Sequence, residues 1–145
     1  MRPKVGEIWL HTAFYHCKES GELLPKFLAI LGITQGSDIV LRLLTSRPNL
    51  RELAKCSHDE TTPGYFLGAF DPENGLRNDT WLDLRGLEDL DVLQWDRTFA
   101  KGVLTKKSTI PADEFCDLLL CAIRARDTSG YQETALYATR TNLGC

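Results

Sequence analysis

Apolar and polar residues alternate in the N-terminal third of the chain with the period of two that β-strands show. Over residues 7–16 the two alternating sets are Ile8, Leu10, Thr12 and Phe14, and Trp9, His11, Ala13 and Tyr15. Two apolar runs, 26–33 and 39–45, flank the turn-forming segment GITQGSD, which predicts a hairpin. In the second run Ile39, Leu41 and Leu43 share one face of the strand, with Arg42 on the other.

The strand pattern stops in the polar segment 46–63, which contains Pro48 and Pro63. Irregular segments of this length are more often functional or mobile than structural, so we expect this loop to be mobile and to border any binding site. Two further strands are predicted at 64–70 and 80–84, separated by the turn-rich sequence DPENGLRND.

The last third has the period of a helix. Pro111 suits a first helical position, and apolar residues then recur at helical spacing: Phe115, Leu118, Leu119, Ala122 and Ile123. We predict an amphipathic helix over 112–126 and a short final helix capped by Ser129 and Gln132. Strands followed by helix indicate one α+β domain over residues 1–145, built on a strongly curved antiparallel sheet of five to seven strands or a small SH3-like β-barrel.

Composition fits a globular domain: 145 residues, 43% hydrophobic, with a formal charge of −3. An acidic chain does not attract nucleic acid as a whole, so RNA binding would need a local basic patch. No apolar run is long enough for a membrane span, and no leader pattern is visible, so the expected compartment is the cytoplasm, with reduced thiols. The cysteine count is odd and the spacing suggests no disulfide framework: Cys17, Cys56, Cys116, Cys121 and Cys145.

Several segments, in order along the chain, resemble those of the PemK/MazF-like toxins of type II toxin–antitoxin pairs. They are KVGEIWL, LPKFLAIL, DIVLRLLTSRP, TWLDLRGLEDLD and AKGVLTKKSTIPADEFCDLL. The resemblance implies an SH3-like barrel that acts as a metal-independent endoribonuclease on single-stranded RNA, without a cofactor. It also implies a homodimer and an antitoxin protein as partner.

The family places an arginine immediately before the proline of its second strand, but residue 24 is leucine here. Lys26 shares a strand face with Leu24 and could replace that arginine as a point charge. The family's Thr-Ser pair is present as Thr45 and Ser46, and Arg85 lies one residue nearer to Asp83 than is usual. These matches give Lys26, Thr45, Asp83 and Arg85 as catalytic candidates, and Ser46, Arg47 and His58 as substrate-binding candidates.

Other interpretations of these residues remain open. Asp83 and Arg85 could form a surface ion pair, and the whole domain could be a catalytically silent module that binds a peptide or protein. His11 or His58 could serve as an acid–base group. A zinc site from His16, Cys17, Cys56 and His58 fits no compact zinc motif, so no metal is expected. We expect Cys116 and Cys121 to be packing residues, and Trp9, Trp81 and Trp95 to be core residues more readily than base-stacking ones.

Overall fold

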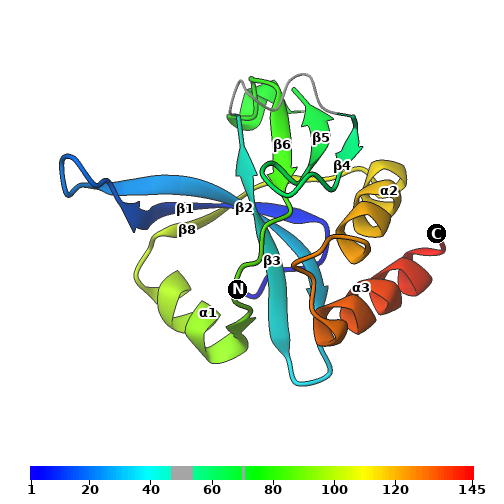
Figure 1. Ribbon diagram of the computed structural model, residues 1–145. Helices are drawn as coiled ribbons and strands as arrows, with labels where there is room; N and C mark the ends of the chain where they lie inside the picture. The colour runs from blue at the N-terminus through cyan, green and yellow to red at the C-terminus, as the bar shows by residue number, and fades with distance from the viewer. Residues whose placement is uncertain (47–53, 70) are drawn as a thin grey trace.

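The computed structural model describes residues 1–46, 54–69 and 71–145 (Figure 1). Within them an open sheet of eight strands has the order β4-β5-β6-β3-β2-β1-β8, with β7 paired to β3. The strands are β1 (Glu7–His16), β2 (Leu23–Ile33), β3 (Asp38–Thr45), β4 (Cys56–Ser57), β5 (Gly64–Gly68), β6 (Thr80–Asp83), β7 (Leu90–Asp91) and β8 (Leu104–Thr109). The helices are α1 (Val92–Ala100), α2 (Ala112–Ile123) and α3 (Gly130–Leu143), with a 3-10 turn at Pro72–Asn74.

Every strand pairing is antiparallel, so the predicted α+β class and the antiparallel sheet are confirmed. Of the two architectures predicted, the structure has the curved open sheet. It is not a closed barrel, because the two end strands of the sheet, β4 and β8, do not pair with each other. The predicted five to seven strands were too few. The two-residue strands β4 and β7 are too short to leave a periodic signal in the sequence.

Helices cover both faces of the sheet centre. Figure 1 shows α1 on one side of the long strands and the α2–α3 pair on the other. On the α1 side, Trp9 and Trp95 are fully buried and meet edge to face, with ring centroids 5.0 Å apart. Strand β3 contributes to both cores, Ile39 and Leu41 to one and Val40 and Leu44 to the other. Burial on both faces explains why this stretch of sequence is almost continuously apolar.

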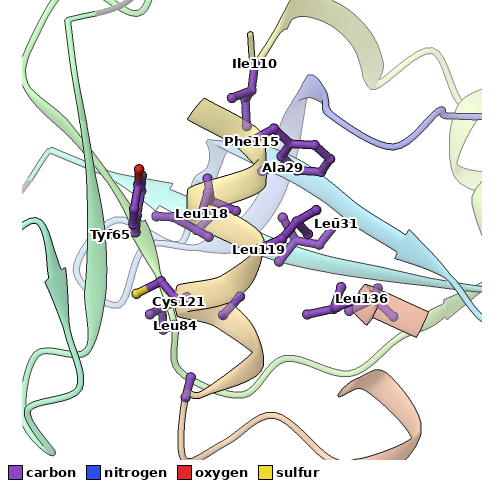
Figure 2. Packing of buried hydrophobic residues seen from close by; sticks show 14 of the residues in the cluster. Ala29, Leu31, Tyr65, Leu84, Ile110, Phe115, Leu118, Leu119, Cys121 and Leu136 are labelled. Carbon is purple, nitrogen blue, oxygen red and sulfur yellow. The ribbon is translucent and has the colours of Figure 1, made fainter. Parts of the chain in front are cut away.

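The α2 helix packs its predicted apolar stripe on the sheet. In Figure 2, Phe115 and Leu119 point from α2 toward Ala29 and Leu31 of β2, and Leu136 of α3 closes the cluster. The helix ends at Ile123, three residues before the predicted boundary. The capping box of Ser129 and Gln132 is confirmed at the start of α3, which is longer than the short helix predicted.

The α1 helix was not predicted. It begins with a capping box formed by Asp91 and Gln94, directly after the short strand β7. Its buried residue, Trp95, donates its indole hydrogen to the Met1 carbonyl at 2.9 Å. Only nine residues long, α1 offers too few turns for a clear helical period in the sequence.

The prediction of reduced thiols is wrong for four of the five cysteines. Cys56 of β4 is bonded to Cys121 of α2, and Cys116 of α2 to Cys145, which leaves Cys17 as the free thiol. Cys116 and Cys121 are therefore cross-links as well as packing residues. The paired residues are 65 and 29 positions apart, and only the fold brings their Cα atoms to 5.9 and 5.7 Å.

The predicted loop 46–63 contains strand β4, which the disulfide ties to α2. Residues 47–53 of that loop lie outside the described residues. None of the helices in the described ranges is long and apolar enough to cross a membrane.

Candidate functional site

The register of three neighbouring strands lines up the predicted catalytic residues. Leu28 of β2 lies opposite Leu43 of β3. Lys26 and Thr45 are each two residues along their strands from this pair, so they share its face. Thr45 in turn lies opposite Trp81 of β6, and Asp83, two residues along that strand, shares the face of Trp81. Residues opposite one another in an antiparallel sheet project on the same face. Lys26, Thr45 and Asp83 therefore face the same side of the sheet.

Two hollows, which together we call the cleft, adjoin at Tyr15, Lys26 and Thr45. The first has a volume of about 450 Å³ and is lined by Phe14, Tyr15, Lys26, Leu43, Thr45, Asp83, Arg85, Gly86 and Leu87. The second, of about 550 Å³, shares Tyr15, Lys26 and Thr45 with the first, and adds polar groups that include Ser46, Asn78 and Thr80. The second is also lined by Pro25, Phe27 and Leu44, which alternate with Lys26 and Thr45 along their strands. All four predicted catalytic residues thus line the first hollow. Volumes of this size are typical of sites for small organic groups.

Asp83 and Arg85 form a two-point ion pair at the wall of the first hollow. The Arg85 Nη2 group donates to Asp83 Oδ2 at 2.8 Å, and Nε lies 3.1 Å from both carboxylate oxygens. The hydrogen bonds to Asp83 and its negative charge hold the pKa of Arg85 above the ordinary value. The side chain of Asp83 is 15% exposed and that of Arg85 49% exposed, so the guanidinium is the part that meets solvent.

Lys26 and Tyr15 lie together at the boundary of the two hollows. The Lys26 ammonium is 5.9 Å from the centroid of the Tyr15 ring, a cation–π distance. Phe14 and Tyr15 both line the first hollow, although neighbours on a regular strand point to opposite faces. The pairing of β1 with β2 shifts register between His11 and Tyr15, and such an irregularity re-aims side chains. Sequence reasoning missed these two aromatic residues because a period of two assigns them to different faces.

The substrate-binding candidates Ser46 and His58 lie in different hollows. Ser46 lines the second hollow, while Arg47 lies outside the described residues. His58 lines a different hollow, with Asp59, Glu60, Arg126 and Asp127 among its neighbours. Its Nε2 atom is 2.9 Å from the carbonyl oxygen of Cys121.

The structure also places the residues of the alternative interpretations: the possible zinc ligands, the three tryptophans and His11. His16 and Cys17 are at the far end of the β1–β2 hairpin, away from β4, so the four residues considered as zinc ligands do not come together (Figure 1). Trp9, Trp81 and Trp95 are at most 2% exposed, which confirms them as core residues and leaves none to stack on a base. The acid–base candidate His11 accepts a hydrogen bond from the Ala13 N–H, and burial lowers its pKa.

No protein-family model, curated protein or solved structure matches the chain. The resemblance to the PemK/MazF-like toxins therefore rests on the sequence segments alone.

Proposed function

We propose that the cleft binds single-stranded RNA and cleaves it as a metal-independent endoribonuclease of the PemK/MazF-like kind. The convergence of Lys26, Thr45, Asp83 and Arg85 on one hollow carries this proposal. They come from β2, β3, β6 and the residues that follow β6, and they supply a carboxylate, two cations and a hydroxyl. Those are the groups that attack by a ribose 2′-hydroxyl on its own phosphodiester requires.

In the proposed reaction the 2′-oxygen attacks phosphorus, the bond from phosphorus to the 5′-oxygen breaks, and a 2′,3′-cyclic phosphate forms. Asp83 takes the 2′-hydroxyl proton, and the Lys26 ammonium supplies a proton to the leaving 5′-oxygen. Arg85 and Lys26 stabilise the charge that develops on the phosphoryl oxygens, and the Thr45 hydroxyl orients the phosphate. Asp83 accepts a hydrogen bond from the Arg85 main-chain N–H at 3.0 Å as well as from the guanidinium, so it must give up one of these contacts to bind and deprotonate the 2′-hydroxyl.

The cleft also offers the local patch that an acidic protein needs for RNA. Its described lining carries Lys26 and Arg85 against the single carboxylate Asp83, whereas the chain as a whole has a charge of −3. The rings of Phe14 and Tyr15 provide faces on which unpaired bases can stack. Together these features favour a single strand, whose bases are accessible, over a duplex.

A specific observation also supports the second candidate, a catalytically silent module that binds a peptide. The Asp83 carboxylate is largely covered and forms an ion pair with Arg85. Such a pair can stabilise the wall of the cleft without any transfer of a proton. The walls formed by Phe14, Leu43 and Leu87 suit an apolar peptide side chain. An antitoxin partner and a homodimer, which the resemblance implies, stay predictions under either function.

Incubation of the purified protein with single-stranded RNA in the presence of EDTA tests the proposal. We expect cleavage, with 2′,3′-cyclic or 3′-phosphate ends on one fragment and a 5′-hydroxyl on the other, identified by mass spectrometry. Absence of cleavage over a random RNA pool would contradict the proposal and leave the peptide-binding module as the better function. Cleavage that requires a divalent ion would contradict the proposed chemistry.

The cleavage rate of the Lys26→Ala variant tests whether the activity resides in the cleft. We expect its cleavage rate to fall by roughly 10²-fold, as loss of one preorganised charge-stabilising donor does in other enzymes. Thr45→Ala should lose less, because its hydroxyl only orients the phosphate. The matched control is Lys101→Ala, which removes an exposed lysine at the end of α1, on another part of the molecule. An equal loss in both lysine variants would mean that only overall charge matters.

A further inference from the structure

Three metal-ligating side chains meet outside the cleft, where β4 approaches α2. Cys56 lies on β4, His58 directly follows that strand, and Cys121 lies on α2. The His58 Nε2 atom is 3.5 Å from the sulfur of Cys56 and 3.7 Å from that of Cys121. All three potential ligand atoms lie within 4.8 Å of one another. We call these three residues the Cys/His cluster.

The distances from the His58 nitrogen to the two sulfurs fit the coordination shell of zinc. With Zn–S bonds of about 2.3 Å and Zn–N bonds of about 2.0 Å, tetrahedral angles separate a sulfur from a nitrogen by about 3.5 Å. The Nε2 atom of His58 already lies near this distance from both sulfurs. The sulfurs, which are bonded to each other in the disulfide, must separate to about 3.8 Å after reduction to occupy two tetrahedral positions. We propose that, once the Cys56–Cys121 disulfide is reduced, Cys56, His58 and Cys121 bind Zn²⁺ through two thiolates and one imidazole nitrogen.

The proposal requires reduction before metal binding, because the sulfurs of a disulfide are not thiolate ligands. A dithiol reductant transfers two electrons and two protons to the Cys56–Cys121 bond and becomes a disulfide itself, which leaves two thiols. Zn²⁺ then displaces both thiol protons and keeps its oxidation state. In the reverse step a disulfide oxidant takes two electrons from the thiolates and, with two protons from solvent, becomes a pair of thiols, while the Cys56–Cys121 bond forms again and the ion is released. The disulfide and the zinc site are therefore alternative states of the same pair of cysteines.

The surroundings of the cluster suit three protein ligands and one open position. Cys121 is buried, whereas Cys56 and His58 are exposed, so the fourth position faces solvent and can hold water. His58 must give up the contact of Nε2 with the Cys121 carbonyl and carry its proton on Nδ1. Two thiolates and a neutral imidazole form a soft donor set that favours zinc over calcium or magnesium.

Zinc binding would preserve the link between β4 and α2 that the disulfide makes. Residues of β4 pair with β5, which pairs with β6, the strand that carries Asp83. In both states this edge of the sheet stays attached to the helix layer. The inference is independent of the proposed ribonuclease, because none of the three ligands lines the cleft as described.

Titration with Co²⁺, a spectroscopic substitute for Zn²⁺, tests the proposal on the full chain. The protein is reduced with a phosphine, which brings no thiolate, and the metal is added without oxygen. We expect thiolate-to-cobalt charge-transfer absorption with one metal per chain, visible bands of a tetrahedral site, and displacement of both by Zn²⁺. No charge-transfer absorption in the reduced protein, or equal binding by the oxidised protein, would overturn the proposal.

Variants identify the ligands. Cys56→Ser and Cys121→Ser should each weaken binding by more than about 100-fold, since loss of even an outer-shell partner costs about 10- to 100-fold. The disulfide is absent from the reduced wild type as well, so the comparison reports ligation and not cross-linking. His58→Ala should weaken binding similarly and abolish the tetrahedral visible bands.

Cys17→Ser and Cys116→Ser are the matched controls, because they remove cysteines that lie outside the cluster. Unchanged binding in both supports the proposal. Loss of binding in Cys17→Ser, or full binding by His58→Ala, would contradict the assigned ligand set. As a second readout, Zn²⁺ should raise the melting temperature of the reduced wild type and not that of Cys56→Ser.

Discussion

Glu7 is a nearly buried carboxylate that three donors keep in its charged form. It is 7% exposed and accepts hydrogen bonds from the Lys4 N–H at 2.6 Å and from the Trp9 indole at 3.2 Å. The Lys106 ammonium lies 3.1 Å from its other oxygen. Burial alone would raise the pKa of Glu7, but these partners together hold it below its ordinary value. Glu7 thereby fixes the start of β1 against β8.

Glu7→Gln should lower the free energy of unfolding at neutral pH. The stability of this variant should also depend less on acid pH than that of the wild type. A carboxylate with a lowered pKa in the folded protein stabilises the fold above its unfolded pKa of about 4.3. That stabilisation is lost as the pH falls through the folded pKa. The gap in unfolding free energy between wild type and variant, measured with urea, should therefore shrink from pH 7 to about pH 3.

The exposed residue Glu88 provides the control, and Glu88→Gln should change stability by no more than about 0.5 kcal/mol at pH 7. A gap between wild type and Glu7→Gln that stays constant down to acid pH would show that the charge of Glu7 does not stabilise the fold.

Arg42 is a charged residue that the fold buries completely. It is 1% exposed, and its guanidinium donates to its neighbour's carbonyl, Leu41 O, and to Gln132 Oε1 of α3 at 3.1 Å. Gln132 in turn donates to Asp89 at 2.8 Å. Burial lowers the pKa of Arg42, and the charges of Asp89, Asp127 and Asp83 oppose that shift. The strand pattern placed Arg42 on the face opposite Leu41, and the packing of α3 covered that face.

Among the elements, α2 contributes most plainly to the larger core. Phe115, Leu118 and Leu119 are at most 2% exposed. In Figure 2, Phe115 and Leu119 lie beside residues of β2, and Leu118 points toward Tyr65 of β5. A large residue in such a position contributes through both its transfer from water and its close packing. The period of the sequence was sufficient to identify this stripe, because a helix laid on a sheet must be apolar on the covered side.

Leu119→Ala should lower the unfolding free energy by about 2–4 kcal/mol, because it removes buried methyl groups and leaves a cavity. Denaturation with urea, followed by tryptophan fluorescence, measures the loss. The matched control is Leu93→Ala on α1, where the leucine is 60% exposed and the same substitution should cost less than about 0.5 kcal/mol. A wild-type-like midpoint for Leu119→Ala would mean that α2 presents another face to the sheet.

At the scale of the whole molecule, two cross-links hold the helix layer to the sheet and to the chain end. Cys56–Cys121 closes a span of 65 residues and Cys116–Cys145 one of 29. A cross-link stabilises a protein largely by restricting its unfolded chain, more so for a long span. Both disulfides include a residue of α2, so this helix is held covalently at two points as well as by packing.

Alkylation of the unreduced protein in denaturant should modify one cysteine, Cys17, and alkylation after reduction should modify five. Peptide mapping by mass spectrometry identifies the labelled residues. Each disulfide should contribute about 3–5 kcal/mol to the unfolding free energy, so reduction, which breaks both, should lower the urea midpoint. Labelling of all five cysteines without a reductant would contradict the cross-links.

The sequence by itself determined the elements whose periodicity is long enough to read. The alternation in β1 and β3, the apolar stripe of α2 and the Ser129–Gln132 cap of α3 are local consequences of side-chain spacing, and they sufficed for the α+β class. The candidates Lys26, Thr45 and Asp83 came from the resemblance of their segments to a toxin family. The strand periodicity of the sequence did not by itself make them neighbours.

Only the tertiary structure decided which strands are adjacent and which segments meet. The pairing of β3 with both β2 and β6 brings the candidate residues to one cleft, and an irregularity in β1 adds Phe14 and Tyr15 to it. The disulfides and the contact of His58 with Cys121 join segments more than 25 residues apart in sequence. No local pattern encodes such contacts, because they depend on the path of the chain between the two segments.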